Sequence, residues 1–184
     1  RETIVIPDGV TLDGANRTIT ATGNLSNFDA ALLLAEDNPG GAHVRNLVLR
    51  GSNLDTNCAA ESYGLRFVDT SATIANVTIR DIAIPCWTSI AAVSEQAGHS
   101  IAVRDSDLRG GTVGYGITVD GDIATTIEDN IIGEFFSAGV RLDGATGTVQ
   151  NNQFGDTVFG VGIQQHGGDV DAVFNTISDT AVGI

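Results

Sequence analysis

The sequence predicts an all-β protein in which short strands stack as the successive coils of a solenoid. Three observations lead to this prediction: the chain repeats itself about every 23 residues, apolar residues alternate with small or polar ones inside each repeat, and Gly, Asp and Asn separate the alternating runs. A repeat of this length cannot bury its apolar face alone. We therefore expect each strand to pair in parallel with its copy in the next coil, about 4.8 Å away.

The repeat is clearest between residues 138–156 and 161–179, which have nearly the same pattern in different letters. Positions that match 23 residues apart are Gly139 with Gly162, Val140 with Ile163, Gly144 with Gly167, Asn152 with Asn175, Phe154 with Ile177 and Asp156 with Asp179. Gly116 lies one further period before Gly139, and residues 63–81 and 89–110 fit the same frame with insertions. The repeat thus covers most of the chain.

The expected strands follow in order along the chain. Clear alternation marks residues 117–119 and 140–142, while the Asp-Gly pairs at 13–14, 120–121 and 143–144 indicate turns. We expect one domain over residues 1–184, with about seven coils and no C-terminal cap. The residues expected to face inward are Val10, Leu12, Leu47, Leu49, Leu65, Phe67, Val77, Ile79, Ile117, Val119, Val140, Leu142, Phe154, Ile163 and Ile177.

Composition excludes several classes of function. The chain has 184 residues and a net charge of −14, with nine arginines and no lysine, so a nucleic-acid partner is not expected, because binding a phosphate backbone relies on clusters of Lys and Arg. No apolar run approaches the roughly 18 residues that a membrane span needs. An acidic surface without lysine suits either high salt or a secreted protein.

The chain resembles the right-handed parallel β-helix proteins of the pectate-lyase-like superfamily. The resemblance is carried by the opening residues 4–21, by glycine–apolar pairs at 64–65, 116–117, 139–140 and 162–163, and by a polar series. That series resembles the internal asparagine ladder of the family and consists of Asn46, Asn76, Ser106, Asn130, Asn152 and Asn175. Asn tolerates the left-handed conformation at a tight bend and can bond to its copy in the next coil. As a ladder member, Asn76 is expected to be buried.

The family's catalytic signatures do not transfer to this chain. Lyases and epimerases with a lysine base are excluded because the chain has no lysine. The polygalacturonase pattern is matched only by the Gly-His-Ser at 98–100, and the pectate lyase, pectin methylesterase and alginate epimerase signatures are missing. The resemblance therefore implies a fold, and this fold serves enzymes, adhesins and phage fibres alike.

One polar strip is predicted from the residues themselves. If Val140 and Leu142 point inward, their neighbours point outward, and the repeat places equivalent residues of adjacent coils about 4.8 Å apart. The strip then contains Asp120, Asp143 and His166 as candidate catalytic residues together with Arg141, and Thr118 and Gln164 as candidate substrate-binding residues. Two close carboxylates could act as acid and base beside an arginine that holds a uronate, or could together bind Ca²⁺; no other metal or cofactor is implied. The alternative interpretation is an ordinary solvated face with Asp-Gly turns.

Arg66 and the two cysteines complete the candidate set. Arg66 lies on the same face as Arg141 with two coils between them and could line a sugar-binding groove, or could be plain surface. Cys58 lies in extra residues that lengthen one repeat, and Cys86 closes the next coil beside Trp87. A disulfide between them would pin this insertion to the solenoid, and the alternative is two buried free thiols.

Two functions remain open from the sequence. The first is an extracellular or cell-surface β-helix module with a structural or glycan-contacting role in a surface protein, fibre or filament. The second is a carbohydrate-active enzyme, a lyase, hydrolase or epimerase, that acts on an acidic polysaccharide through the strip. The chain stops at residues 182–184, which restate Val161, Gly162 and Ile163. We therefore expect further C-terminal coils or end-to-end contact with another copy, and the remaining alternative is a self-capped monomer.

Overall fold

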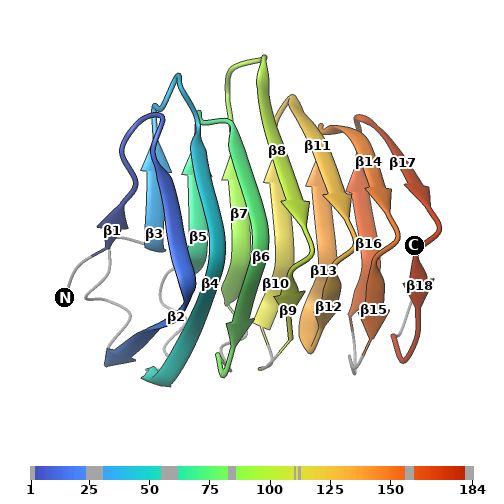
Figure 1. The fold of residues 1–184 in the computed structure, drawn as a ribbon. Helices are drawn as coiled ribbons and strands as arrows, with labels where there is room; N and C mark the ends of the chain where they lie inside the picture. The colour runs from blue at the N-terminus through green and yellow to red at the C-terminus, as the bar shows by residue number, and fades with distance from the viewer. Residues whose placement is uncertain are drawn as a thin grey trace.

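The computed structural model describes residues 3–23, 31–54, 62–82, 86–109, 111, 113–155 and 160–180. Within these ranges every regular element is a strand, and the strands wind into a parallel β-solenoid of about six turns. Figure 1 shows the coils side by side along one axis, with the N-terminal coil at one end and the C-terminal coil at the other. The predicted fold class is confirmed.

The solenoid completes fewer turns than the expected seven, because most of its coils contain more residues than the 23-residue repeat. Along one row of paired residues, from Ile4 through Leu33, Leu65, Ile90, Ile117 and Val140 to Ile163, successive partners are 29, 32, 25, 27, 23 and 23 residues apart. Only the last two coils in this row have the 23-residue period. The earlier coils carry insertions, so the described chain completes fewer turns.

One sheet, here called sheet A, contains seven strands of the described chain, one from each successive coil. In spatial order they are β1 (Ile4–Val5), β3 (Ala31–Glu36), β5 (Ser62–Val68), β7 (Trp87–Val93), β10 (Val113–Asp120), β13 (Phe135–Asp143) and β16 (Val161–His166). All neighbouring strands are parallel.

The second sheet, sheet B, is bent into two arms. In the first three coils a single long strand crosses the bend, and these strands are β2 (Thr11–Gly23), β4 (Ala42–Leu54) and β6 (Ala72–Arg80). In later coils the bend separates two strands. The first arm then consists of β8 (His99–Arg104), β11 (Ile123–Glu128), β14 (Thr146–Gln150) and β17 (Asp169–Val173), and the second of β9 (Asp107–Leu108), β12 (Ile131–Gly133), β15 (Gln153–Gly155) and β18 (Thr176–Ile177).

The hydrophobic core fills the space between the sheets. Twelve of the fifteen residues predicted to face inward are buried, and Leu12 and Ile177 are partly buried and pack against the core. The prediction that Val10 faces inward is wrong. Val10 is 40% exposed, because it belongs to the turn before β2 and not to the strand. Trp87 is a core residue and is 1% exposed.

Gly64, Gly116 and Gly139 of the glycine–apolar pairs face the core at points where the coils lie close together. A Cβ on Gly116 would lie 2.6 Å from Cγ2 of the buried Ile132 and 2.5 Å from the carbonyl oxygen of Gly139 in the next coil. The following residue, Ile117, is also buried. Two consecutive inward positions interrupt the strand alternation, so the residue before the glycine faces out.

Polar side chains form a buried ladder at the bend of sheet B. The side-chain amide of Asn130 donates to Oδ1 of Asn152 at 2.9 Å, and that of Asn152 donates to Oδ1 of Asn175 at 3.1 Å. The backbone amide of Ser106 donates to Oδ1 of Asn130 at 3.0 Å. Ser106, Asn130 and Asn152 are buried. The predicted ladder is therefore confirmed from Ser106 to Asn175.

The first two members of the predicted ladder occupy a different position. Asn76 donates to Oδ1 of Asn46 at 2.8 Å, but it is exposed, so the prediction that it is buried was wrong. The register pairs Thr78 with Asp107, which aligns Asn76 with Asp105 and not with Ser106. Residues at this position have positive φ, 52° at Asn76 and 49° at Asp105. The left-handed residue points outward, and the ladder residue that follows it points inward.

No helix in the described ranges is long and apolar enough to cross a membrane.

Candidate functional site

The outer face of sheet A carries three rows of side chains that run along the solenoid axis. The tyrosine row is Ala31, Tyr63, Thr88, Tyr115, Ala138 and Val161. The arginine row is Leu34, Arg66, Ala91, Thr118, Arg141 and Gln164. The acidic row is Glu36, Val68, Val93, Asp120, Asp143 and His166. Adjacent members of a row are about 4.8 Å apart at the backbone.

The residues of the predicted strip are neighbours in the acidic row and in the arginine row, as the repeat predicts. Asp143 pairs with Asp120 on one side and with His166 on the other. Arg141 pairs in the same way with Thr118 and Gln164. Asp120 and His166 are exposed, whereas Asp143 is half-buried. The stacking that the repeat predicts is thus present, and the chemical roles assigned to these residues stay predictions.

Arg141 connects the acidic row to the tyrosine row. Its guanidinium forms an ion pair with Asp143, with 3.4 Å between Nη2 and Oδ2. The same guanidinium lies 5.8 Å from the centre of the Tyr115 ring, which is within the range of a cation–π contact. The two contacts fix the orientation of Arg141 and keep its charge next to a carboxylate.

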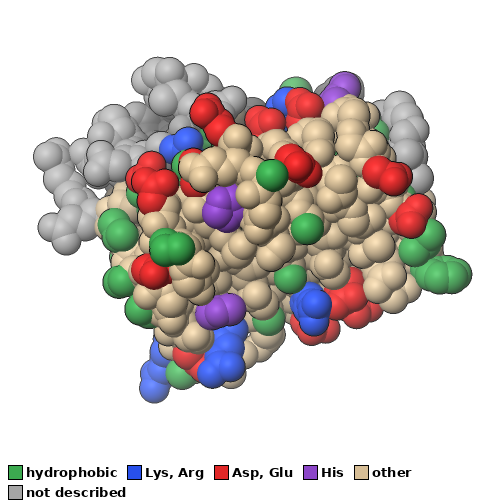
Figure 2. All heavy atoms as spheres, turned by 90° about the horizontal axis from the view of Figure 1, so that it is seen from above, with side chains coloured by type: hydrophobic (Ala, Val, Ile, Leu, Met, Phe, Trp, Pro, Cys, Tyr) green, Lys and Arg blue, Asp and Glu red, His purple; other side chains and the backbone are tan. Residues whose placement is uncertain are grey.

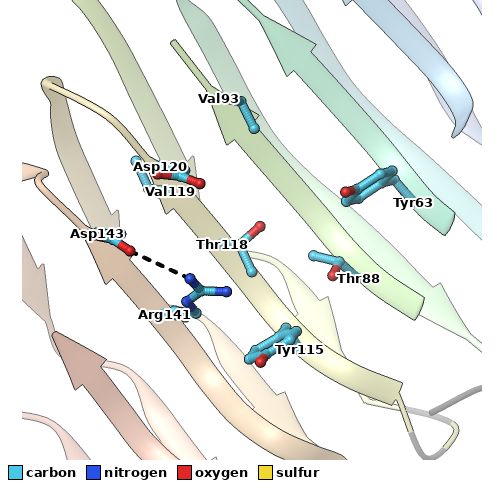
Figure 3. A pocket seen from close by; sticks show the side chains of 9 residues that line it. All are labelled: Tyr63, Thr88, Val93, Tyr115, Thr118, Val119, Asp120, Arg141 and Asp143. Carbon is cyan, nitrogen blue, oxygen red and sulfur yellow. Dashed lines mark hydrogen bonds and ion pairs between the residues drawn. The ribbon is translucent and has the colours of Figure 1, made fainter. Parts of the chain in front are cut away.

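A hollow of about 300 Å³, here called the sheet A hollow, opens between the rows. It is lined by Tyr63, Thr88, Val93, Tyr115, Thr118, Val119, Asp120, Arg141 and Asp143, as Figure 3 shows. The hollow arises because β7 contributes small outward side chains between coils with larger ones. Thr88 pairs with Tyr63 on one side and Tyr115 on the other. Thr88 is buried at the floor, and the two tyrosines form opposite walls.

Arg66 lies beside the hollow, next to its Tyr63 wall. Its guanidinium lies 5.0 Å from the centre of the Tyr63 ring. Its Nε is buried and has no hydrogen-bond partner among the described residues. The register places Arg66 three coils before Arg141 in the arginine row, with Ala91 and Thr118 between them, as the sequence predicted.

The structure brings only part of the predicted site together. Thr118, Asp120, Arg141 and Asp143 line the hollow, whereas Gln164 and His166 belong to the next coil and are not part of its lining. The lining residues absent from the predicted set are Tyr63, Thr88, Val93, Tyr115 and Val119. The two tyrosines carry a signal in the sequence, because each directly precedes the glycine of a glycine–apolar pair.

Only one of the two cysteines of the predicted disulfide lies within the described residues. Cys58 lies outside the described residues. Cys86 is half-buried and packs against the hydrophobic core. The pairing of the two cysteines stays a prediction.

The acidic residues of the described chain offer few ligands for a metal ion. Among the described residues, no three His, Cys, Asp or Glu side chains come close enough to hold a metal ion together. The two carboxylates of Asp120 and Asp143 alone offer few of the six to eight oxygen ligands that Ca²⁺ takes.

Comparison of the chain with models of protein families, with curated proteins and with solved structures finds no match.

Proposed function

We propose that this protein is an extracellular β-helix module that contacts glycans, and that it binds them in the sheet A hollow. The observation that carries the proposal is the pair of tyrosine walls on either side of the buried Thr88. Tyrosine presents a flat apolar ring with a polar end, and a sugar ring has the matching combination of apolar C–H face and hydroxyl edge. The volume of about 300 Å³ is at the lower limit of typical ligand pockets.

The polar lining supports the same proposal. Thr118 supplies a hydroxyl, Arg141 supplies hydrogen-bond donors, and Asp120 and Asp143 supply acceptors. A few convergent polar groups on a largely preformed surface are typical of small-ligand sites. An extracellular setting is supported by the predicted Cys58–Cys86 disulfide, since such bonds persist in oxidising compartments.

The proposal is tested by measuring binding of the protein to an array of oligosaccharides and polysaccharides. We expect at least one glycan to bind, and Thr88→Trp to abolish that binding by filling the floor of the hollow. Thr126→Trp is the matched control, because Thr126 is a half-buried outward residue of β11 on sheet B, away from the hollow. Circular dichroism and the melting temperature establish that both variants fold. Binding that survives Thr88→Trp, or no binding to any glycan, would contradict the proposal.

A carbohydrate-active enzyme of the pectate-lyase-like superfamily is the second candidate. It is favoured by the asparagine ladder, by the glycine–apolar pairs and by the position of Asp120 directly beside Asp143 in adjacent coils. Two carboxylates on one face could serve as acid and base. If this candidate is right, the protein cleaves or epimerises a uronic-acid polymer. Asp143→Asn then abolishes turnover and keeps the melting temperature within a few degrees, since a half-exposed carboxylate contributes little to packing.

A further inference from the structure

The charged side chains around the sheet A hollow cancel one another. Arg141 is paired with Asp143 at 3.4 Å, and Asp120 is the neighbour of Asp143 in the acidic row. The second cation near the hollow is Arg66, whose guanidinium lies over the ring of Tyr63. One guanidinium and two carboxylates therefore line the hollow, with Arg66 beside it, and the site offers no surplus of positive charge to an anionic ligand.

The surroundings of the hollow add negative charge. The turns that follow the strands of sheet A cover residues 6–10, 37–41, 69–71, 94–98, 121–122, 144–145 and 167–168. They contain Asp8, Asp37, Asp69, Glu95 and Asp122, and no arginine. Figure 2, which looks onto this edge of the solenoid, shows acidic side chains spread along it. With a net charge of −14 for the chain, a polyanion would approach the hollow against a repulsive field.

We infer that the ligand of the sheet A hollow is a neutral, hydroxyl-rich glycan and not an acidic polysaccharide. The inference rests on the proposed function, because it names the class of glycan that the same site takes. Sugar hydroxyls can donate to Asp120 and Asp143 and accept from Arg141, so a neutral ligand satisfies the carboxylates without replacing the Arg141–Asp143 pair. A uronate would have to compete with Asp143 for Arg141. Its binding would also leave the negative charge of Asp143 beside the carboxylate of the ligand.

The test uses polymers that differ only in charge. Polygalacturonate is compared with its carboxyl-reduced product, and alginate with its own carboxyl-reduced product, within the same glycan array. We expect the array members that bind to be neutral, and any backbone that binds in its reduced form to bind about tenfold or more weakly as the uronate at low salt. The difference should shrink in 1 M salt, because the Debye length falls from about 10 Å at 0.1 M to about 3 Å.

A charge variant provides the second arm of the test. In Asp120→Asn/Asp143→Asn the hollow loses both carboxylates and keeps Arg141, with Arg66 beside it, so we expect the preference for the neutral member to fall and uronate binding to rise. Tighter binding of the uronate by the unmodified protein overturns the inference and leaves the proposed function standing. A preference for neutral glycans that neither salt nor the double variant changes would keep the class of ligand and overturn the assignment of the preference to Asp120 and Asp143. Absence of binding to every member of both classes overturns the proposed function itself.

Discussion

The side-chain amide of Asn130 donates a hydrogen bond to Oδ1 of Asn152 one coil further on, at 2.9 Å, and both residues are 1% exposed. Each of these amides also satisfies backbone groups. Nδ2 of Asn130 donates to the carbonyl of Val103 at 2.9 Å, and Nδ2 of Asn152 donates to that of Ile127 at 2.9 Å. The ladder thus supplies the hydrogen bonds that the backbone loses where sheet B bends, and it fixes the register of successive coils.

Asn130→Ala should lower the free energy of unfolding by about 2–4 kcal/mol, because it leaves the buried Val103 carbonyl and the buried Ser106 amide without their side-chain partners. Chemical denaturation followed by circular dichroism measures the loss. Asn76→Ala is the matched control, since the Asn76–Asn46 bond is exposed; it should cost less than about 1 kcal/mol. Equal losses for the two variants would contradict the assignment of the ladder.

The ladder illustrates how far the sequence alone could lead. The shared 23-residue spacing of Asn152 and Asn175 identified the buried positions directly, because no insertion separates those coils. Between Asn76 and Ser106 the coil is longer, so the spacing does not distinguish the left-handed position, which Asn76 occupies, from the inward position one residue later. Both positions favour Asn for different reasons, one for backbone conformation and one for hydrogen bonding. Only the register of the folded chain separates them.

Gly116→Ala should destabilise the protein by about 1–3 kcal/mol, since the new methyl group would overlap the core side chain of Ile132 and the backbone of the next coil. The melting temperature measures this change. Gly155→Ala is the control, because the nearest atom to a Cβ there is Oγ of Ser178 at 3.3 Å, the end of a side chain that can rotate. A Gly116→Ala protein as stable as the control would show that the coils can separate at this point.

Asp13 should make stability depend on pH. A hydrogen bond from the backbone amide of Ala15, then one from the Asn46 side chain, and the adjacent Arg45 lower the pKa of Asp13 below its ordinary value of 3.8. A lowered pKa in the folded state means that the ionised form contributes stability above pH 3.8, and that this stability disappears as the pH falls through the folded-state pKa. Asp13→Asn should therefore lower the melting temperature at pH 7 and have no effect at the acidic end of the titration.

The control for Asp13 is Asp122→Asn, at an exposed position in the turn after β10. It should leave the melting temperature unchanged at neutral pH. An Asp13→Asn effect that is constant from pH 7 to pH 2 would mean that the side chain acts through its shape and not through its charge.

The predicted Cys58–Cys86 disulfide is tested by thiol titration of the unfolded protein without reductant. We expect no free thiol, and reduction should lower stability by about 3–4 kcal/mol, given a closed loop of nearly 30 residues. Cys86→Ser should have the same effect as reduction. Two free thiols would exclude the bond and would remove the main support for an extracellular setting.

The sheet A hollow was less predictable than the fold. The strip from Thr118 to Asp143 followed from the repeat, because coils of nearly equal length fix which residues are neighbours. The hollow also requires that a coil of small outward residues lies between two coils with tyrosines. The coils before and after β7 differ in length, so the sequence does not show that Thr88 pairs with both Tyr63 and Tyr115. Shape at a surface therefore depends on the exact register across several coils, whereas the fold depends only on the period.

Tyr115 should contribute directly to glycan binding, and the contribution of its ring can be separated from that of its hydroxyl. Tyr115→Ala removes one wall of the hollow and the ring beneath the Arg141 guanidinium, so we expect affinity to fall by about tenfold, in line with about 0.5–1.5 kcal/mol for a stacking contact. Tyr115→Phe keeps the ring and removes only the hydroxyl, and should retain most of the affinity if stacking is the main interaction. Isothermal titration calorimetry with a glycan found on the array measures both variants.

The half-buried ring of Tyr115 lies on the outer face, so the melting temperature of each variant should change by only a few degrees. If Tyr115→Phe weakens binding as much as Tyr115→Ala, the hydroxyl and not the ring carries the contact, and the wall does not act as a stacking platform.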